Sequence, residues 1–408
     1  MASDTRLADV ADVIMGQSPP GSTYNEIGQG LAFFQGVKDF GYRFPTPRVY
    51  CTAPTRIAQP GDILLSVRAP IGRVNIADRE CATGRGLAII RPHDPGDARY
   101  LEFVLRWLES SWRAIEGGGS VFGNATKKDL VSLALPWPEH AAERAAISSI
   151  LGALDDKIEL NRRMSETLEG IARALFKSWF VDFDPVRAKA EGEDPGLPAP
   201  IAELFPASLE QGAPRRVPSG WRVARLDEEF DIVMGQSPPG ESYNEDGNGP
   251  RFFQGRADFG HRFPSDRVYC TAPTRFAKSG DTLMSVRAPV GDLNVALEDC
   301  AIGRGLAALR HKSGSAAFTY YSMQALQDEF FRYEARGTVF GSITKKDLAG
   351  TQHVVPPEHL VAAFDRMVGP IDDRLRVAET SSRVLTDLRD ACLPQLMNGN
   401  VRVGGVPA

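Results

Sequence analysis

The run MGQSPPG at residues 15–21 occurs again, letter for letter, at residues 234–240. From there the chain matches itself at a constant offset of 219 residues for more than seventy positions, about two-thirds of them identical. Both copies carry FFQG, RVYCTAPTR, SVRAP and GRGLA, and after a one-residue slip VFGNATKKDL at Val121 matches VFGSITKKDL at Val339. With two copies only, the pattern predicts a pseudo-symmetric pair of domains rather than a solenoid. Two like domains predict two like ligand sites.

Each copy has the pattern of a mixed α+β domain. Short runs rich in β-branched residues, such as DILLSVRAP and LAIIRP, are bounded by Gly and Pro, which is typical of short strands joined by tight turns. Helical patterns are confined to residues 98–115 and to their counterparts, residues 316–335. We expect the first domain at residues 1–140 and the second at residues 221–357.

A long amphipathic pattern follows each domain, at residues 141–183 and at residues 358–399. Apolar residues recur every three or four positions, as on one face of a helix. The first face consists of Ile147, Leu151, Leu154, Ile158, Leu168, Ile171, Leu175 and Trp179, and the second of Phe364, Val368, Ile371, Leu375, Ala378, Leu385, Leu388, Cys392 and Leu396. Helices of roughly 30 to 40 residues are about 45 to 60 Å long, more than one small domain needs. We predict that the two helices pack on each other as an antiparallel coiled coil separating two globular domains.

Three details qualify this picture. Pro370 interrupts the second pattern, so its unbroken part is expected to begin there with the proline in the first turn. Asn161 falls on the seam of the first helix, where a polar residue can fix the register, and local exposure is the alternative. Residues 184–220 are rich in Pro, Gly and charge and predict an extended linker.

Composition bounds the class of protein. With 408 residues, 42% hydrophobic and 24% charged, the chain has ample material for more than one core. Charges interrupt the N-terminal stretch, so it lacks the pattern of a signal peptide, and no apolar run approaches the roughly 18 residues that span a bilayer. We expect a cytoplasmic protein. The formal net charge of -5 argues against generic polyanion binding but leaves a local basic patch open.

Signatures of catalysis and metal binding are missing from the sequence. The five cysteines include no CxxC pair and the six histidines no HExxH spacing, so no metal site is expected. Small buried thiols are expected at Cys51, Cys81 and their counterparts, with a bridge within each copy as the alternative. No Walker loop, dinucleotide fingerprint, nucleophile elbow or (D/N)PP(Y/F) methyltransferase signature occurs, and GGGSVFG at residues 117–123 is interpreted as a flexible turn. We expect a protein that binds a ligand and has no catalytic residues.

Planar and cationic side chains recur in loops of both copies. Arginine can pair bidentately with guanine and glutamine with adenine, while lysine suits phosphate. The Lys-Lys pairs after Thr126 and Thr344 open apparent helices, whose N-termini add donors for the same anion. For any single arginine a surface salt bridge is the alternative. The candidate DNA-binding residues are Gln35, Lys38, Arg43, Arg68, Lys127, Lys128, Gln254, Arg256, Arg262, Arg287, Lys345 and Lys346.

The whole chain resembles the specificity subunits of type I restriction-modification systems. The stretch ILGALDDKIELNRRMSETLEGIARALFKSWFVDFDPVRAK, residues 150–189, is similar to the central conserved helix of that family. GLP near Gly196, LFP near Leu204 and VPSGW ending at Trp221 resemble its lead into a second target recognition domain. IDDRLRVAETSSRVLTDLRDACLPQLMNG, residues 371–399, resembles the distal conserved helix.

This resemblance implies a subunit that is not a catalyst. Its two target recognition domains would bind the halves of a split sequence in double-stranded DNA, and its helices would space them and dock two modification subunits. Those partners would bind S-adenosylmethionine and methylate adenine, and any restriction subunits would use ATP and Mg to translocate and cleave DNA. A two-module protein-binding scaffold with a self-associating coiled coil is the alternative. A self-contained restriction-methylation enzyme would need catalytic motifs and a longer chain.

The chain departs from the family in one respect, because family members commonly carry two recognition domains of unrelated sequence. Near copies at the ends of an antiparallel pair would bind the same short sequence on opposite strands, which predicts a nearly palindromic split site. Differences between the halves are expected at unmatched positions: Val37 against Arg256, Lys38 against Ala257, Tyr42 against His261 and Arg73 against Asp292.

The aromatic end of the first helix is the candidate anchor for a modification subunit. It consists of Phe176, Trp179, Phe180 and Phe183. Large aromatic residues on an exposed stripe tend to mark contact sites. Packing against the other helix is the alternative.

Overall fold

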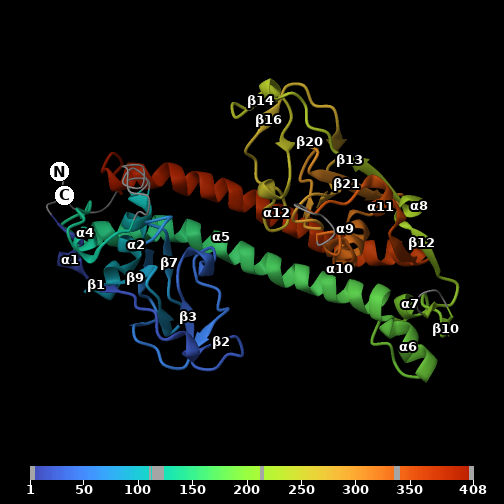
Figure 1. The fold of residues 1–408 in the computed structure, drawn as a ribbon, viewed down its shortest axis with the longest axis horizontal. Helices are drawn as coiled ribbons and strands as arrows, with labels where there is room; N and C mark the ends of the chain where they lie inside the picture. Colours follow the sequence, from blue (N-terminus) through green and yellow to red (C-terminus); the bar gives the residue numbers. More distant parts are fainter. Residues whose placement is uncertain (1–4, 110–111, 113–123, 212–215, 335–340, 404–408) are drawn as a thin grey trace. The chain divides into compact units, whose positions relative to one another are not determined.

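The computed structural model describes residues 5–109, 112, 124–211, 216–334 and 341–403. The chain divides into two compact units. Unit 1 comprises Met1–Arg162 and Thr380–Ala408, and unit 2 comprises Arg163–Glu379. Both contain helices and sheets, as the predicted α+β class requires (Figure 1).

Two sheets form the domain of unit 1. An antiparallel sheet has the order β1-β9-β6-β7. A mixed sheet of shorter strands, smaller in residues, has the order β2-β4-β3-β8-β5, and in it β3 and β8 run parallel. The bounds are β1 Ala11–Met15, β2 Tyr24–Asn25, β3 Leu31–Phe34, β4 Tyr50–Cys51, β5 Ile57–Ala58, β6 Ile63–Ser66, β7 Val74–Ile76, β8 Cys81–Thr83 and β9 Leu87–Pro92. The predicted strands in DILLSVRAP and LAIIRP are therefore confirmed as β6 and β9.

Unit 2 repeats this architecture. Its antiparallel sheet has the order β13-β21-β18-β19, and β15 runs parallel to β20 as β3 does to β8. The bounds are β13 Phe230–Met234, β14 Tyr243–Asn244, β15 Phe252–Phe253, β16 Tyr269–Cys270, β17 Phe276–Ala277, β18 Thr282–Ser285, β19 Leu293–Val295, β20 Cys300–Ile302 and β21 Leu306–His311. An added antiparallel pair joins β12, Arg222–Arg225, to β22, Gln352–Val355.

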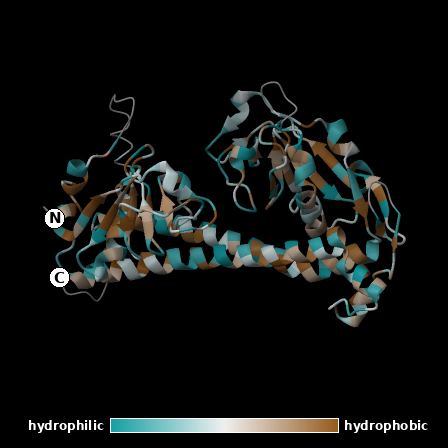
Figure 2. Cartoon of the chain, turned by 60° about the horizontal axis from the view of Figure 1, so that its bottom comes forward, coloured by the Kyte–Doolittle hydropathy of each residue, from teal (hydrophilic) through white to brown (hydrophobic). Residues whose placement is uncertain are grey.

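Short helices pack against the larger sheet of each unit. In unit 1 they are α1 Leu7–Val10, α2 Ala98–Trp107 and α4 Lys127–Val131, and in unit 2 they are α8 Leu226–Glu229, α9 Ala316–Ala325, α10 Gln327–Phe331 and α11 Lys345–Gly350. The helices α2 and α9 begin where the sequence predicts them, and each buries an apolar face that includes Phe103 or Phe318. Figure 2 shows the apolar residues gathered on the strands and on the helices that cover them.

The two long helices are α5, Ala141–Phe176, and α12, Glu358–Met397. In unit 1 they run antiparallel, since Asp155 accepts from Arg389 at 2.8 Å while Asn161, six residues later, donates to Ser382, seven residues before Arg389, at 3.2 Å. Asn161 is buried, so the interpretation as a seam residue is confirmed and local exposure is wrong. A buried polar bond of this kind fixes the register of the pair.

The start of α12 differs from the prediction. The helix begins at Glu358, twelve residues before Pro370, and runs through the proline without a break. An interior proline costs a helix about 3 kcal/mol. Leu360, Phe364 and Val368 on the preceding turns are buried in the core of unit 2, and this burial offsets that cost.

The described part of the segment predicted to be an extended linker is folded. Residues 184–220 contain α6 Asp184–Glu191, α7 Ala199–Ala202, β10 Leu209–Glu210 and β11 Val217–Pro218. Val186, Phe205 and Val217 are buried, and the first two belong to the core of unit 2. Because these apolar residues are widely spaced among polar ones, the composition of the segment did not predict that they are buried.

All five cysteines have free thiols, and four of them are buried, as expected for small core residues. Across the described residues, no three His, Cys, Asp or Glu side chains gather as a metal-binding cluster. Within the same residues, no helix has the length and apolar character needed to cross a membrane. The GGGSVFG turn lies outside the described residues.

Candidate nucleic-acid interface

A polar hollow of about 390 Å³ opens where several strands of unit 1 end. Gln35 follows β3, Arg68 follows β6, Arg85 lies between β8 and β9, and Ser18 follows β1. This first hollow is lined by Ser18, Pro19, Gly21, Tyr24, Gln35, Arg68, Arg85 and Gly86. Side chains far apart in the sequence therefore meet at one surface.

Unit 2 has a second hollow built from the corresponding residues. It has a volume of about 210 Å³ and is lined by Ser237, Gln254, Gly255, Arg256, Arg287, Ala288, Arg304 and Gly305. Five of these residues stand 219 positions after residues of the first hollow: Ser237, Gln254, Arg287, Arg304 and Gly305. The duplicated sequence thus produces a duplicated site.

Glycines hold the strand ends close enough to form each hollow. A Cβ on Gly86 would lie 2.2 Å from the carbonyl oxygen of Gln35, and one on Gly305 would lie 2.3 Å from that of Gln254. Such distances are far inside van der Waals contact, so only glycine fits. The GRG motif, too short for a dinucleotide fingerprint, therefore serves to bring the glutamine loop against the arginine loop.

A buried carboxylate fixes the glutamine in each hollow. Asp39 accepts from the backbone nitrogen of Gln35 at 2.7 Å, and Asp258 accepts from that of Gln254 at 2.6 Å. Both aspartates are buried, so their bonds are shielded from water. The glutamine amide is left at the surface on a rigid backbone.

Four arginines of the hollows have no carboxylate partner among the described residues, whereas Arg256 pairs with Asp292. Arg68, Arg85, Arg287 and Arg304 are exposed, and no carboxylate of a described residue pairs with any of them. A chain with a net charge of -5 thus presents two cationic hollows. Exposed guanidinium groups beside an amide offer a fork of donors suited to phosphates or to the acceptor edges of bases.

The lysine pairs lie at the starts of α4 and α11, as predicted. Thr126 and Thr344 cap these helices by accepting from the backbone nitrogens of Asp129 and Asp347. In unit 2 a further hollow of about 360 Å³ runs from Arg287 and Arg304 to Thr344, the residue before the lysines. All four lysines are exposed. The threonine and aspartate side chains already occupy donors of the helix ends, so the lysine side chains supply the charge.

Two predicted DNA-binding residues, Arg43 and Arg262, are engaged elsewhere. Arg43 pairs with Asp156 of α5 at 2.9 Å and with Glu102 of α2 at 3.3 Å. Arg262 is buried, lies 3.5 Å from the ring centroid of Tyr320 and pairs with Asp372 of α12 at 2.8 Å. Each arginine forms an ion pair between a domain and a long helix of its own unit. This is the salt-bridge role given above as the alternative to DNA binding. We therefore leave both out of the candidate interface.

The predicted exposed aromatic stripe is also a structural feature. Phe176, Trp179, Phe180 and Phe183 are all at most 5% exposed and belong to the core of unit 2. Phe176 and Phe180 pack against Phe364 of α12, with ring centroids 5.5 and 5.4 Å apart. The prediction of an exposed stripe is wrong, because the second helix and the folded segment after α5 cover it. Packing against the other helix, the alternative, is confirmed.

Sequence reasoning missed part of the hollows. Arg85 and Arg304 recur within GRGLA but were not among the selected candidates, and neither were Ser18 and Ser237 of MGQSPPG. The hydroxyl of Ser18 accepts from the backbone nitrogen of Arg85 at 3.2 Å, and Ser237 does the same for Arg304. Identity between the copies was the available signal. Lys38 is exposed next to Val37 and does not line the first hollow.

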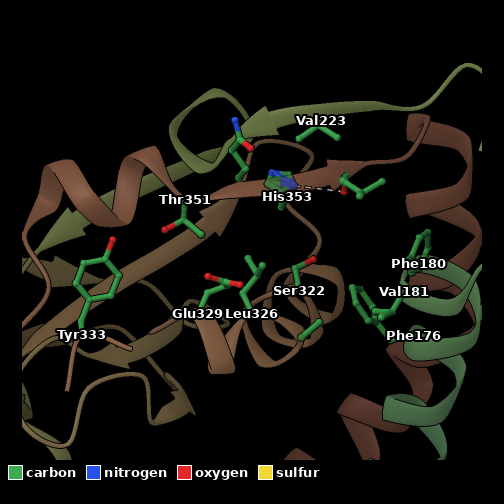
Figure 3. Close-up of a pocket in the computed structure, with 13 residues that line it drawn as sticks. Phe176, Phe180, Val181, Val223, Ser322, Leu326, Glu329, Tyr333, Thr351 and His353 are labelled. Atoms are coloured by element: carbon green, nitrogen blue, oxygen red, sulfur yellow. Dashed lines mark hydrogen bonds between the residues drawn. The ribbon is translucent and has the colours of Figure 1, made fainter. Parts of the chain in front are cut away.

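A hollow of another kind lies within unit 2, beneath the β12–β22 pair (Figure 3). It measures about 560 Å³, and apolar side chains that include Phe176, Phe180 and Leu326 line much of it. Its ionisable wall residues include Glu329 and His353, and burial lowers the pKa of His353 to about 4. Without a cationic wall it does not suit an anionic ligand.

Comparison with known proteins identifies the family of the first domain. The model for the type I restriction modification DNA specificity domain matches residues 4–170. These residues form a domain of that family. Unit 2 repeats much of the matched sequence at an offset of 219 residues. The resemblance inferred from the conserved helices is confirmed.

Relatives of known name match most of the chain. A Methanocaldococcus jannaschii protein named as the specificity subunit of type I restriction enzyme MjaX is 29% identical over 84% of this chain and 79% of its own length. The MjaIX specificity subunit of the same organism is 27% identical over 89% of this chain and 83% of its own length.

A solved structure extends the comparison to the fold. The type I restriction-modification S subunit from M. genitalium superimposes with a TM-score of 0.60, covering 97% of this chain and 96% of that one. Its sequence identity of 16% shows the fold alone. This chain therefore shares the fold of that S subunit.

Proposed function

We propose that this chain is the non-catalytic DNA specificity subunit of a type I restriction-modification complex, each hollow binding one half of a split DNA site. The observation that carries the proposal is the duplicated hollow, in which a fixed glutamine stands beside two arginines that pair with no carboxylate of the described part of the chain. Glutamine suits adenine and arginine suits guanine in the major groove. The exposed lysine pairs supply phosphate contacts that orient the duplex.

The two half-sites are nearly palindromic under this proposal. The hollows share serine, glutamine and two arginines at equivalent positions, so they present nearly the same donors and acceptors. The proposal includes an inverted relation between the two like domains, which follows from the predicted antiparallel helix pair. Equal domains in inverted relation bind the same sequence on opposite strands.

Partner subunits supply the chemistry in this proposal. Two modification subunits bind S-adenosylmethionine and methylate adenine, and restriction subunits, where present, use ATP and Mg. Their docking surface is an exposed apolar stripe on the long helices, in place of the buried aromatic cluster. In unit 1 the stripe consists of Ile150, Leu160, Val384 and Leu388, all at least 42% exposed.

The stripe is duplicated like the hollows. Exposed apolar residues recur 217 positions apart on the two helices, in the pairs Ile150 and Met367, Leu160 and Val377, and Ile171 and Leu388. Exposed apolar side chains at equivalent positions favour two equal contacts. This supports one modification subunit for each unit.

Base-resolution mapping of methylated adenine in the host tests the proposal. Replacing Arg68 and Arg85 together with alanine should abolish methylation, because two arginine contacts contribute about 2 to 6 kcal/mol of discrimination. Arg79→Ala is the matched control, since Arg79 is an exposed arginine of unit 1 that pairs with its neighbour Asp78. Full methylation in the double variant would contradict binding through the hollow, and two unrelated half-sites in the wild type would contradict the near palindrome.

A further inference from the structure

The two hollows differ at one wall. Arg256 lines the second hollow, whereas Val37 is the residue 219 positions earlier. Both residues open a short 3-10 turn, Val37–Asp39 in unit 1 and Arg256–Asp258 in unit 2. The turns are held alike by their aspartates, so the difference lies in the side chain alone.

A second exchange accompanies the first. The side chain of Arg256 donates through Nε to the carboxylate of Asp292. In unit 1 the position of Asp292 is taken by Arg73, which pairs with Glu109 at 3.2 Å. The pair Val37 and Arg73 in unit 1 thus corresponds to the pair Arg256 and Asp292 in unit 2. The pair of exchanges places a guanidinium on the wall and a carboxylate that holds it.

The other unmatched positions lie away from the hollows. Tyr42 accepts through its hydroxyl from Arg389 of α12 at 3.0 Å. His261, its counterpart, lies 3.8 Å from the carboxylate of Glu169 on α5. Both face a long helix of their own unit. The exchange of Lys38 for Ala257 affects exposed residues that line neither hollow.

We propose that Arg256 binds one guanine in the second half-site that the first half-site does not require, an inference that rests on the proposed function. The bond to Asp292 uses Nε, so the two terminal amino groups of the guanidinium remain as donors. Held by a carboxylate, that fork fits O6 and N7 of guanine. The near palindrome is therefore broken at one position.

An exchange experiment on the full chain in its host complex tests this. Arg256→Val with Asp292→Arg copies the wall of unit 1 into unit 2, and Val37→Arg with Arg73→Asp makes the reverse exchange. All four residues are partly or fully exposed, so folding should persist, as circular dichroism can verify. The first exchange should relax one guanine of the methylated motif by about 5- to 150-fold, and the second should add a guanine preference in the other half.

Probes and outcomes separate this inference from the function on which it rests. Replacing that guanine with 7-deazaguanine in a test duplex should weaken binding by the wild-type complex but not by the Arg256→Val, Asp292→Arg complex. An unchanged motif in both exchanges overturns the role of Arg256, and relaxation of every position in the half-site does so too. If Arg287→Ala with Arg304→Ala also leaves methylation intact, the hollow itself is not the binding site.

Discussion

An arginine can serve a ligand only when the rest of the protein leaves its guanidinium free. Arg68 lies exposed at a strand end without a carboxylate partner among the described residues, whereas Arg262 is buried over Tyr320 and paired with Asp372. Both recur in their duplicated copies, so recurrence alone does not separate the two roles. Burial separates the two roles. If a buried arginine such as Arg262 left its carboxylate to bind DNA, the carboxylate would remain buried without a compensating charge.

At the residue scale, Gly86→Ala should disable the first hollow without removing any polar group. The added methyl would meet the carbonyl oxygen of Gln35 at 2.2 Å and push the glutamine loop away, at a cost of about 1 to 3 kcal/mol. Methylation mapping should then show relaxed recognition of one half-site. Gly170→Ala, at a helical position with open space for a methyl, is the control and should leave the motif unchanged. An unaltered motif in Gly86→Ala would count against the hollow.

His353 predicts a pH dependence at the same scale. Burial, with His311 and Arg222 nearby, lowers the pKa of His353 from 6.5 to about 4. The unfolded chain therefore binds the extra proton first, so stability is intact above pH 6.5 and falls between pH 6.5 and 4, by about 3 kcal/mol at most.

The measurement is urea unfolding at pH 7 and at pH 4.5. His353→Gln should flatten the fall in the free energy of unfolding, because the side chain no longer titrates. His140→Gln, at an exposed histidine, should retain the wild-type slope. The same slope in wild type and His353→Gln would show that other groups govern the acid limb.

At the element scale, the long helices carry two apolar faces with separate uses. The buried face holds α5 and α12 together, as Ile147 and Leu151 do in unit 1. The exposed stripe is the proposed docking surface. Replacing Val384 and Leu388 with serine should weaken capture of a modification subunit about 10-fold or more, since each removes about 1 kcal/mol of apolar contact.

Controls distinguish docking from helix stability. The double variant Val384→Ser, Leu388→Ser should keep its helical circular dichroism, because both residues are about half or more exposed. Arg332→Ala, at an exposed position on the turn after α10, should not affect capture. Undiminished capture by the stripe variant would place docking elsewhere.

Hydrophobic periodicity predicted where the long helices lie, but it did not predict which residues on them are exposed. The 3-4 spacing located both long helices and the seam residue Asn161, because burial along a helix face leaves a regular trace. The same spacing cannot tell whether a residue such as Phe176 meets solvent or another element. The expected start of the second helix at Pro370 was also wrong, because the burial of Phe364 and Val368 outweighs the low helix propensity of proline.

At the scale of the whole molecule, the duplication was the most informative sequence feature. It predicted two like domains and two like sites, and the structure has two equivalent hollows. Their members could not all be chosen beforehand, since Ser18 and Arg85 meet only when β1 and the β8–β9 turn lie side by side. Composition likewise could not reveal Val186 and Phe205 as core residues of the supposed linker.

Truncation provides the prediction at this scale. Removing residues 380–408 should destabilise unit 1, because Leu396 and Met397 belong to its core and each contributes about 1.5 to 3 kcal/mol of burial. Asp155, fully buried, would also lose Arg389. Limited proteolysis should then cut unit 1 while sparing unit 2. Removing residues 404–408 alone is the control, and equal resistance of both truncated chains would contradict the expectation.

Unit 1 is assembled from the two ends of the chain, Met1–Arg162 and Thr380–Ala408. On a ribosome residues 1–162 emerge before unit 2, yet the helical segment that completes their core emerges after it. Unit 2, a continuous stretch, can finish in between. The domain begun first is therefore completed after unit 2, and in the interval its apolar residues around Ile147 and Leu151 lack the helix that covers them, a condition that favours aggregation.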